Sequence, residues 1–177
     1  MHLANSLFNL NQEREAVALA RRAIEGRARV FGPDHTLTLR ARTFLLHIFT
    51  GPEDVAAGSN LVADHYRKFG GDNSMTLGTV LNYAFILRKA GRAMDALPHA
   101  QAAFTGYAQR FGHDYPVTLS ARHSLSKILA ELGQHAKAIV HAEKLVEGRT
   151  RVLGPEHPWT LEAQELLDEY RRGQSSI

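Results

Sequence analysis

The chain has 177 residues, of which 44% are hydrophobic and 22% are charged, so it carries enough apolar side chains for a packed core and does not have the composition of a disordered chain. It contains no cysteine, which excludes disulfide scaffolds, thiol catalysis and cysteine-bound zinc. Its 21 basic and 18 acidic residues leave a formal net charge of +3, too small a bias to indicate a nucleic-acid-binding surface.

Helical periodicity runs along the chain without a competing strand pattern. The residues before Leu10 are expected to form part of a first helix. We expect Pro98 to remove one early backbone hydrogen bond and to bend or delay its helix. Residues 173–177 are expected to be a frayed, flexible tail. The other helices are predicted at about residues 12–30, 36–50, 53–68, 75–90, 93–110, 116–132, 135–152 and 158–172.

Four similar segments mark a repeat, and their glycines are 38, 42 and 42 residues apart. Residues 11–32 and 133–154 share 9 identities in 22 aligned positions. Each repeat holds two helices, and a single helical hairpin cannot bury its apolar face, so the hairpins are expected to stack into an α-solenoid. The four segments are Phe31–Leu39, Phe69–Leu77, Phe111–Leu119 and Leu153–Leu161.

The hairpins resemble the tetratricopeptide repeat, in which leucine, a small residue, glycine and alanine recur at set positions. Leu125, Ser126, Gly133 and Ala138 occupy these positions in one repeat, and Tyr83, Ala84, Gly91 and Ala96 occupy them in the repeat before it. The 42-residue period and the linker Gly154–Leu161 are similar to those of the kinesin-light-chain subclass.

This resemblance implies an all-α fold, a right-handed α-solenoid of stacked helical hairpins that forms a TPR superhelix. It implies one array over residues 1–172, followed by the tail at 173–177. The parts of the array are a partial unit at 1–30, units at about 31–68, 69–110 and 111–152, and a terminal helix at 153–172.

Two departures from the family pattern carry expectations of their own. The second repeat is four residues short, and Asp54 and Gly58 stand where alanine is expected, so that hairpin is expected to be the loosest. Residues 3–7 match the middle of a first helix, which places Met1 inside that helix. The chain is therefore expected to be a fragment, or the end of a longer protein.

The first helix of each hairpin lines the concave surface in this family, and helix phase then predicts which side chains face it. The predicted stripe, on which Thr43 also falls, has an apolar middle, basic groups beside it and an acidic end at Glu162, Glu165 and Glu169. The predicted groove residues are Arg40, Phe44, His47, Leu81, Asn82, Phe85, Lys89, His123 and Lys127.

Kinesin-light-chain-like repeats bind extended peptides that carry an aromatic or leucine anchor beside acidic residues. Asn82 matches the recurrent asparagine of that family, whereas Phe44 and Ser124 depart from it. The resemblance therefore implies a protein or peptide partner, an extended or helical segment with an apolar anchor and acidic flanks. The alternative is that Phe44 and Phe85 serve helix packing and that Lys127 forms a solvated pair with Glu165.

The chain shows no motif for chemistry. Phosphate-binding glycine loops, nucleophile elbows and closely spaced histidine pairs are absent from the sequence, so we predict no enzyme, no cofactor and no metal. His35 and His157 recur in the linkers and are expected to act in turns or as helix caps. His135 and His141 fall on different faces of one helix and cannot share a metal ion.

The arginines between Arg21 and Arg42 are interrupted by glutamates, which favours a solvated helix face over a nucleic-acid surface. Arg149 and Arg151 repeat Arg27 and Arg29, which indicates a structural or surface role shared by the repeats.

The sequence shows neither a signal peptide nor a membrane-spanning stretch, so a cytoplasmic protein without a membrane partner is expected. Two functions from other classes stay open. The chain can be the C-terminal sensor arm of a larger signalling ATPase or regulator, or it can self-associate through the incomplete N-terminal repeat. A small-molecule effector in the groove has no residue signature.

Overall fold

The computed structural model describes residues 13–48 and 53–174, and every regular element within these ranges is an α-helix. Each helix agrees with its predicted range to within two residues at either end. The predicted helix before Leu10 lies outside the described residues. Gly173 and Gln174 were expected to fray, but they complete the last helix instead. The helices are α2 (Glu13–Phe31), α3 (Thr36–Ile48), α4 (Glu53–Phe69), α5 (Ser74–Lys89), α6 (Ala93–Phe111), α7 (Pro116–Glu131), α8 (His135–Leu153) and α9 (Pro158–Gln174).

The chain divides into two compact units, Met1–Ile86 and Leu87–Ile177. The boundary falls inside α5, so the N-terminal unit contains α2, α3, α4 and most of α5. The C-terminal unit contains the last turn of α5 and helices α6 to α9.

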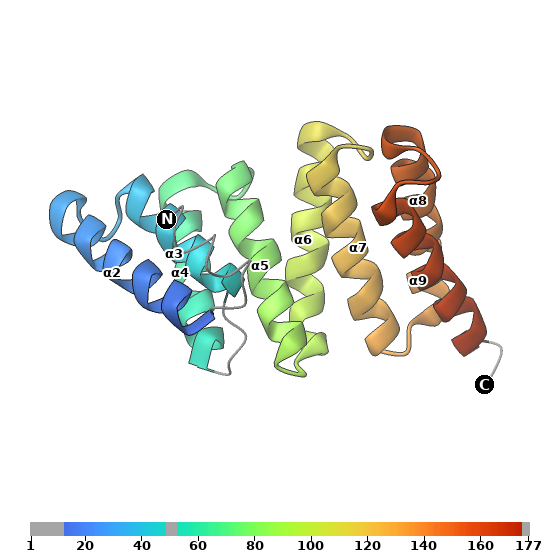
Figure 1. Ribbon diagram of the computed structural model, residues 1–177, viewed down its shortest axis with the longest axis horizontal. Helices are drawn as coiled ribbons and strands as arrows, with labels where there is room; N and C mark the ends of the chain where they lie inside the picture. Colours follow the sequence, from blue (N-terminus) through green and yellow to red (C-terminus); the bar gives the residue numbers. More distant parts are fainter. Residues whose placement is uncertain (1–12, 49–52, 175–177) are drawn as a thin grey trace. The chain divides into compact units, whose positions relative to one another are not determined.

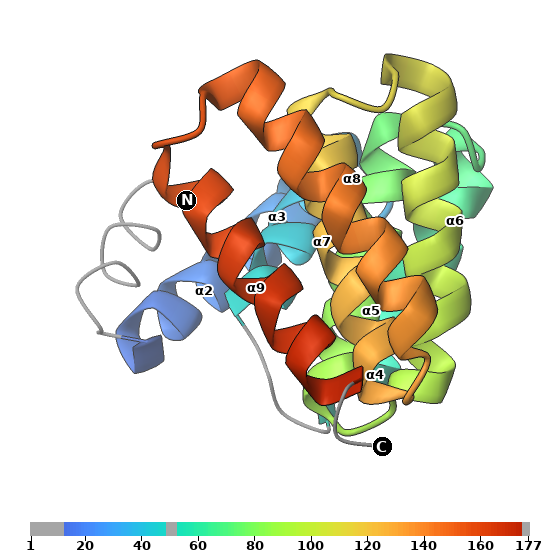
Figure 2. The same cartoon turned by 90° about the vertical axis from the view of Figure 1, so that its right-hand side faces the viewer.

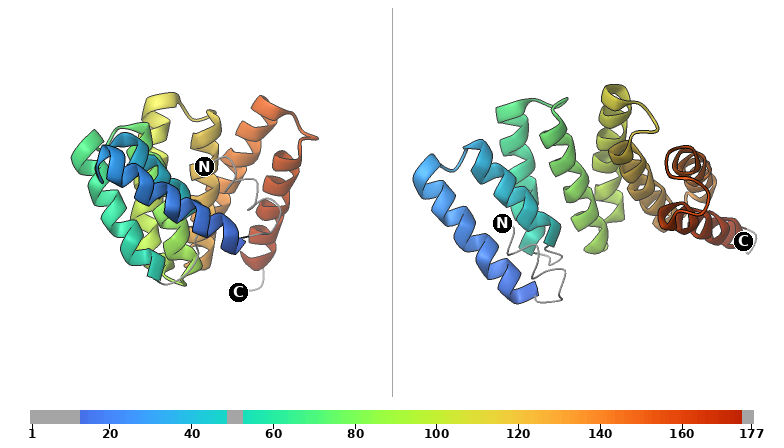
Figure 3. Two further views of the ribbon diagram at one scale, coloured as in Figure 1. Left: turned by 60° about the vertical axis from the view of Figure 1, so that its left-hand side comes forward. Right: turned by 45° about the horizontal axis from the view of Figure 1, so that its top comes forward.

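The N-terminal unit begins with the antiparallel hairpin of α2 and α3 (Figure 3). Its main core joins three helices, with Leu39 and Leu46 from α3, Leu61 from α4 and Ile86 from α5. These four side chains are almost completely buried, and burying a leucine or isoleucine contributes about 1.5–3 kcal/mol. Packing of apolar stripes therefore holds the hairpins together, as the sequence predicts.

A buried polar contact also joins the helices of the N-terminal unit. The hydroxyl of Thr43 lies 3.1 Å from that of Thr79 and 3.4 Å from Nε2 of His65, which is completely buried. The ring of His65 donates from Nδ1 to the carbonyl oxygen of Leu61 at 2.9 Å. Thr43 belonged to the stripe predicted for the groove, but it faces the packed interior because these polar groups need partners there.

In the C-terminal unit α6, α7, α8 and α9 follow one another, with α7 packed on α6 and α8, and α8 packed on α9 (Figures 1 and 2). Leu119, Leu145 and Ala163 form a buried cluster across α7, α8 and α9. Ala138 and Ala142 are completely buried, which confirms that small residues on α8 allow close helix approach.

The linkers between hairpins use their repeated residues for local hydrogen bonds. The Nδ1 atoms of His35 and His157 accept the main-chain N–H groups of Leu37 at 3.2 Å and Trp159 at 3.1 Å. Their carbonyl oxygens accept the first helical bonds of α3 and α9, so both histidines cap a helix N-terminus, as predicted. Asn73 plays the same part before α5, with its Oδ1 accepting from Met75 N at 2.9 Å.

Gly133 is the C′ residue after α7, with φ at +69°. Its N–H donates to the carbonyl oxygen of Ala130, and the N–H of Gln134 donates to that of Leu129, both at 2.9 Å. This pair of bonds is the Schellman motif, which requires the left-handed conformation that glycine adopts without strain.

Pro98 does not delay its helix. Helix α6 begins at Ala93, which is also the first residue of the range predicted for it. The proline sits inside the helix near its start, on the exposed side. The expectation of a delayed start was therefore wrong.

Arg27 and Arg149, near the ends of α2 and α8, each bind the main chain of the next helix. Arg27 donates from Nη1 to the carbonyl oxygen of Leu37 at 3.0 Å, and Arg149 donates in the same way to that of Trp159 at 2.5 Å. Each guanidinium thus holds the first turn of the next helix. The repeated structural role of Arg27 and Arg149 is confirmed.

Candidate functional site

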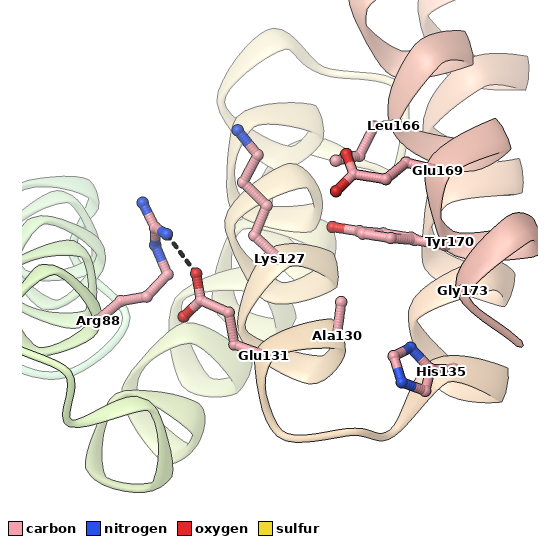
Figure 4. A pocket seen from close by; sticks show the side chains of 9 residues that line it. All are labelled: Arg88, Lys127, Ala130, Glu131, His135, Leu166, Glu169, Tyr170 and Gly173. Carbon is pink, nitrogen blue, oxygen red and sulfur yellow. Dashed lines mark hydrogen bonds and ion pairs between the residues drawn. The ribbon is translucent and has the colours of Figure 1, made fainter. Parts of the chain in front are cut away.

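A pocket of about 420 Å³ opens in the C-terminal unit on the first-helix face, between α7 and α9 (Figure 4). The last turn of α5 contributes to it as well, and all of its residues belong to the C-terminal unit. The lining residues are Arg88, Lys127, Ala130, Glu131, His135, Leu166, Glu169, Tyr170 and Gly173.

The charged side chains of the pocket are unequally paired. Nη1 of Arg88 forms an ion pair with Oε1 of Glu131 at 2.6 Å, drawn as a dashed line in Figure 4. Lys127 is half-buried, and among the residues that the structure describes its ammonium forms no ion pair. The predicted alternative of a pair between Lys127 and Glu165 is therefore not seen in the described part. The ammonium remains able to pair with an external carboxylate.

Two polar groups line the same pocket without a partner. Tyr170 is 6% exposed, and its buried hydroxyl points toward α7 (Figure 4), where the side chain of Ser126 is its near neighbour although no hydrogen bond of good geometry joins them. Burial raises the pKa of Tyr170 to about 12, which keeps its O–H protonated as a donor. Nδ1 of His135 is buried and unpartnered as well. Buried polar groups of this kind are usually satisfied, so both atoms are unusual, but neither is open to solvent.

His123 does not line the pocket and belongs to a polar cluster with Arg149 and Glu162 instead. Its Nδ1 lies 3.4 Å from Nη2 of Arg149, and its Nε2 lies 4.0 Å from Oε1 of Glu162. Burial, helped by the charges of Lys127 and Arg149, lowers the pKa of His123 to about 4. The ring is therefore neutral at pH 7.

The groove residues predicted in the N-terminal unit lie on α3 and α5. Phe44 is half-buried and packs with Leu19 against Ala20 of α2, so its ring takes part in the helix packing that was the alternative. Arg40 on the same helix is exposed. The side chain of His47 lies outside the described residues.

The predicted residues of α5 divide between the two units. Leu81, Asn82 and Phe85 are half-buried in the N-terminal unit, and no hydrogen bond of the Asn82 carboxamide is seen in the described part of the chain. Lys89 is exposed in the C-terminal unit, but its neighbour Arg88 lines the pocket in its place. Of the nine predicted residues, the pocket contains Lys127 alone.

Sequence reasoning missed Arg88, His135 and Tyr170. One signal was available for Tyr170, because the equivalent position of the other repeats holds isoleucine, at Ile48, Ile86 and Ile128. A tyrosine at a position that holds isoleucine in the other repeats buries a hydroxyl group, and a buried hydroxyl usually needs a hydrogen-bond partner. Arg88 was missed because the predicted stripe passed through its neighbour Lys89 on α5, although the same helix phase placed Lys127 and Glu169 at the pocket.

Within the described residues, no group of three or more histidine or acidic side chains is placed to hold a metal ion. No described helix combines the length and the apolar character that crossing a bilayer requires.

Solved structures with the same fold confirm the architecture. A Podosopora anserina protein described as a kinesin light chain with nearly identical TPR-like repeats matches with a TM-score of 0.85 at 20% identity, over 99% of this chain and 85% of that one. A point variant of that protein, with a glutamine replaced by methionine, matches with a TM-score of 0.86 at 20% identity, over 99% and 84%. BtubC (BKLC) from P. vanneervenii matches with a TM-score of 0.73 at 16% identity, over 98% and 78%.

Sequence comparison leads to the same family. No curated protein matches the chain. Two family models described as tetratricopeptide repeat match residues 76–150 and residues 1–37. The predicted all-α TPR solenoid of kinesin-light-chain type is thus confirmed as the fold, and the chain belongs to the tetratricopeptide repeat family.

Proposed function

We propose that the chain binds an extended or helical segment of a partner protein through the face formed by the first helices of its hairpins. The tetratricopeptide fold is a scaffold for protein–protein interaction, and proteins built from it are typically non-enzymatic. One observation supports a specific binding site for the partner segment. Lys127, without an ion pair in the described part, lines a pocket beside the apolar side chains of Ala130 and Leu166.

The chemistry of this pocket suits a segment with acidic and apolar side chains. The ammonium of Lys127 would pair with an acidic flank, and Ala130 and Leu166 offer an apolar wall to the neighbouring anchor. Of the two carboxylates in the lining, Glu131 is engaged by Arg88, whereas Glu169 forms no ion pair among the described residues, so the attraction for an acidic side chain comes from Lys127 and not from the net charge of the pocket.

The N-terminal unit is proposed to contribute through α5. Asn82 has both a donor and an acceptor to offer to a peptide backbone, and Leu81 and Phe85 flank it as apolar contacts. Arg40, Lys89 and His123 remain predicted contributors to the charge of this face. The single TPR array over residues 1–172 likewise remains a prediction.

Affinity capture from the native cell lysate, followed by mass spectrometry, tests the proposal. Wild-type chain is compared with the triple variant Asn82→Ala, Phe85→Ala, Lys127→Glu, whose helicity is checked by circular dichroism. The matched control is Lys137→Glu, the same charge reversal on an exposed residue of α8. The proposal predicts partners that bind wild type and the control but not the folded triple variant. Equal retention by all three proteins, or no partner for any, contradicts it.

The two other functions stay predictions. Self-association through the incomplete N-terminal repeat, the partial unit at 1–30, involves residues 1–12, which lie outside the described part, and light scattering over a range of concentrations tests it. The sensor arm of a larger ATPase or regulator is tested by a longer reading frame with a phosphate-binding loop. The cytoplasmic location also stays a prediction.

A further inference from the structure

Two arginines occupy the same position in different repeats but have different partners. Arg42 and Arg122 each lie ten residues after the glycine of their linker. In the N-terminal unit, Nη1 of Arg42 forms an ion pair with Oδ2 of Asp64 at 2.7 Å. Asp64 lies six residues before the next linker glycine, and the residue at that position in the C-terminal unit is Gly148. The repeat of Arg122 therefore lacks the carboxylate that its counterpart uses.

Arg122 is nevertheless buried, with 5% of its surface exposed. Its guanidinium carbon lies 4.7 Å from the ring centroid of Phe104, and its Nη2 donates to Nδ1 of His113 at 3.3 Å. Its Nε is buried without a hydrogen-bond partner, and no described carboxylate forms an ion pair with it, although Asp114 and Glu147 act on it electrostatically from a longer distance. Burying a guanidinium is costly unless a negative charge compensates it.

A second pocket, of about 370 Å³, lies beside this arginine, between α6 and α8 in the C-terminal unit. Phe104 and Val140 give it an apolar side, and His141 lines it with a buried Nδ1 that has no hydrogen-bond partner in the described residues. Its remaining lining residues are His113, Asp114, Arg122, Lys144, Glu147 and Arg151.

The charged side chains of the pocket limit the net charge that a ligand can carry. Arg151 is held by Asp114 through two bonds, from Nε at 3.0 Å and from Nη2 at 2.7 Å. The three cations and two carboxylates of the lining leave one positive charge. A single negative charge neutralises the pocket, whereas a dianion such as phosphate meets the two carboxylates as well.

We propose that the pocket between α6 and α8 binds a small monocarboxylate, whose carboxylate pairs with Arg122 as Asp64 pairs with Arg42. The hydrocarbon part of the ligand lies against Phe104 and Val140. The site lies among second helices, away from the pocket of Lys127 and Tyr170, and does not depend on the proposed peptide binding. Gly148 is the sequence feature that denies Arg122 a carboxylate of its own, because a Cβ at that position would meet Leu119 Cδ2 at 2.6 Å.

The test titrates the folded chain with sodium benzoate and sodium acetate at constant ionic strength. Sodium chloride and sodium phosphate serve as comparison salts, and ring signals of His113 and His141 are followed by NMR. Benzoate is expected to give saturable shifts at both histidines and a rise in Tm, and acetate a weaker response. Chloride and phosphate are expected to give neither.

Variants locate the site. Arg122→Gln is expected to weaken benzoate binding about tenfold or more. Should that variant not fold, Lys144→Glu, an exposed change on the pocket rim, is expected to weaken binding as well, because it makes the pocket net negative. Arg42→Gln and Lys137→Glu are the matched controls and should retain wild-type affinity. An equal response to chloride, no saturable response to either carboxylate, or unchanged affinity in Lys144→Glu overturns the proposal.

Discussion

The hydroxyl of Thr160 donates to the carbonyl oxygen of Gly154 at 2.8 Å, and so joins the first turn of α9 to the glycine that ends α8. Thr38 makes the same bond to Gly32 at 2.9 Å. In these two linkers, which both contain Gly-Pro, the threonine of the next helix and the glycine are the two ends of one hydrogen bond, whereas Thr76 donates to His65 and Thr118 has no partner in the described residues.

Thr160→Val is expected to lower the free energy of unfolding by about 1 kcal/mol, because an isosteric side chain removes this bond and leaves a carbonyl oxygen without its donor. Thr160→Ser keeps the hydroxyl and should lose less. Urea unfolding followed by circular dichroism measures both. Equal stability of the valine and serine variants would show that the hydroxyl contributes nothing.

His157→Ala is expected to destabilise the chain by about 1 kcal/mol, because it removes the side-chain acceptor at the N-cap of α9. His157→Asn should retain most of the stability, since Asn73 already serves as such an acceptor before α5. Thermal unfolding of the two variants checks this. An asparagine variant as unstable as the alanine variant contradicts the capping role.

Gly58→Ala is expected to destabilise the N-terminal unit by about 1–3 kcal/mol, although alanine normally favours a helix over glycine. A Cβ at this position meets Cδ2 of Tyr83 at 2.6 Å, so the glycine is what lets α4 approach α5. Gly26→Ala is the matched control, because its Cβ meets nothing within 4 Å and the change should stabilise α2. If Gly58→Ala and Gly26→Ala raised the stability equally, the predicted steric clash with Tyr83 would be contradicted. The predicted looseness of this hairpin remains untested.

Acid is expected to destabilise the C-terminal unit through His123. Its folded-state pKa of about 4 lies below the ordinary value of 6.5, so the unfolded chain takes up the proton first as the pH falls. The free energy of unfolding therefore decreases from pH 6.5 to about pH 4 and levels off below it, by about 2 kcal/mol once partial exposure of the ring is allowed for. His123→Gln should flatten this part of the curve. Parallel stability curves for variant and wild type, measured by urea unfolding, contradict the assignment.

Helix boundaries could be predicted from sequence because they depend on chemistry within a few residues of the chain. Gly133 closes α7 and His157 opens α9 through bonds to their immediate neighbours. Such signals survive in any copy of the repeat, which is why the family and the fold were identified before the structure.

The site was harder to predict, because a helix face is defined by what packs against it. Thr43 was expected to face the groove, but it lies against His65 and Thr79 of neighbouring helices. Arg88 lines the pocket instead of Lys89, a difference of one residue that turns a side chain by about 100° around its helix. Cross-helix contacts of this kind leave no local trace in the sequence.

Peptide selection with a charge reversal tests the central claim most directly. A library of random peptides is selected on wild-type chain, on Lys127→Glu and on the control Lys137→Glu, and the enriched sequences are compared. The account predicts peptides with an apolar anchor and acidic residues for wild type and the control, and a shift toward basic residues for Lys127→Glu. The same peptides enriched on all three proteins, or no enrichment on wild type, would contradict the claim that the face of Lys127 and Tyr170 binds a partner segment.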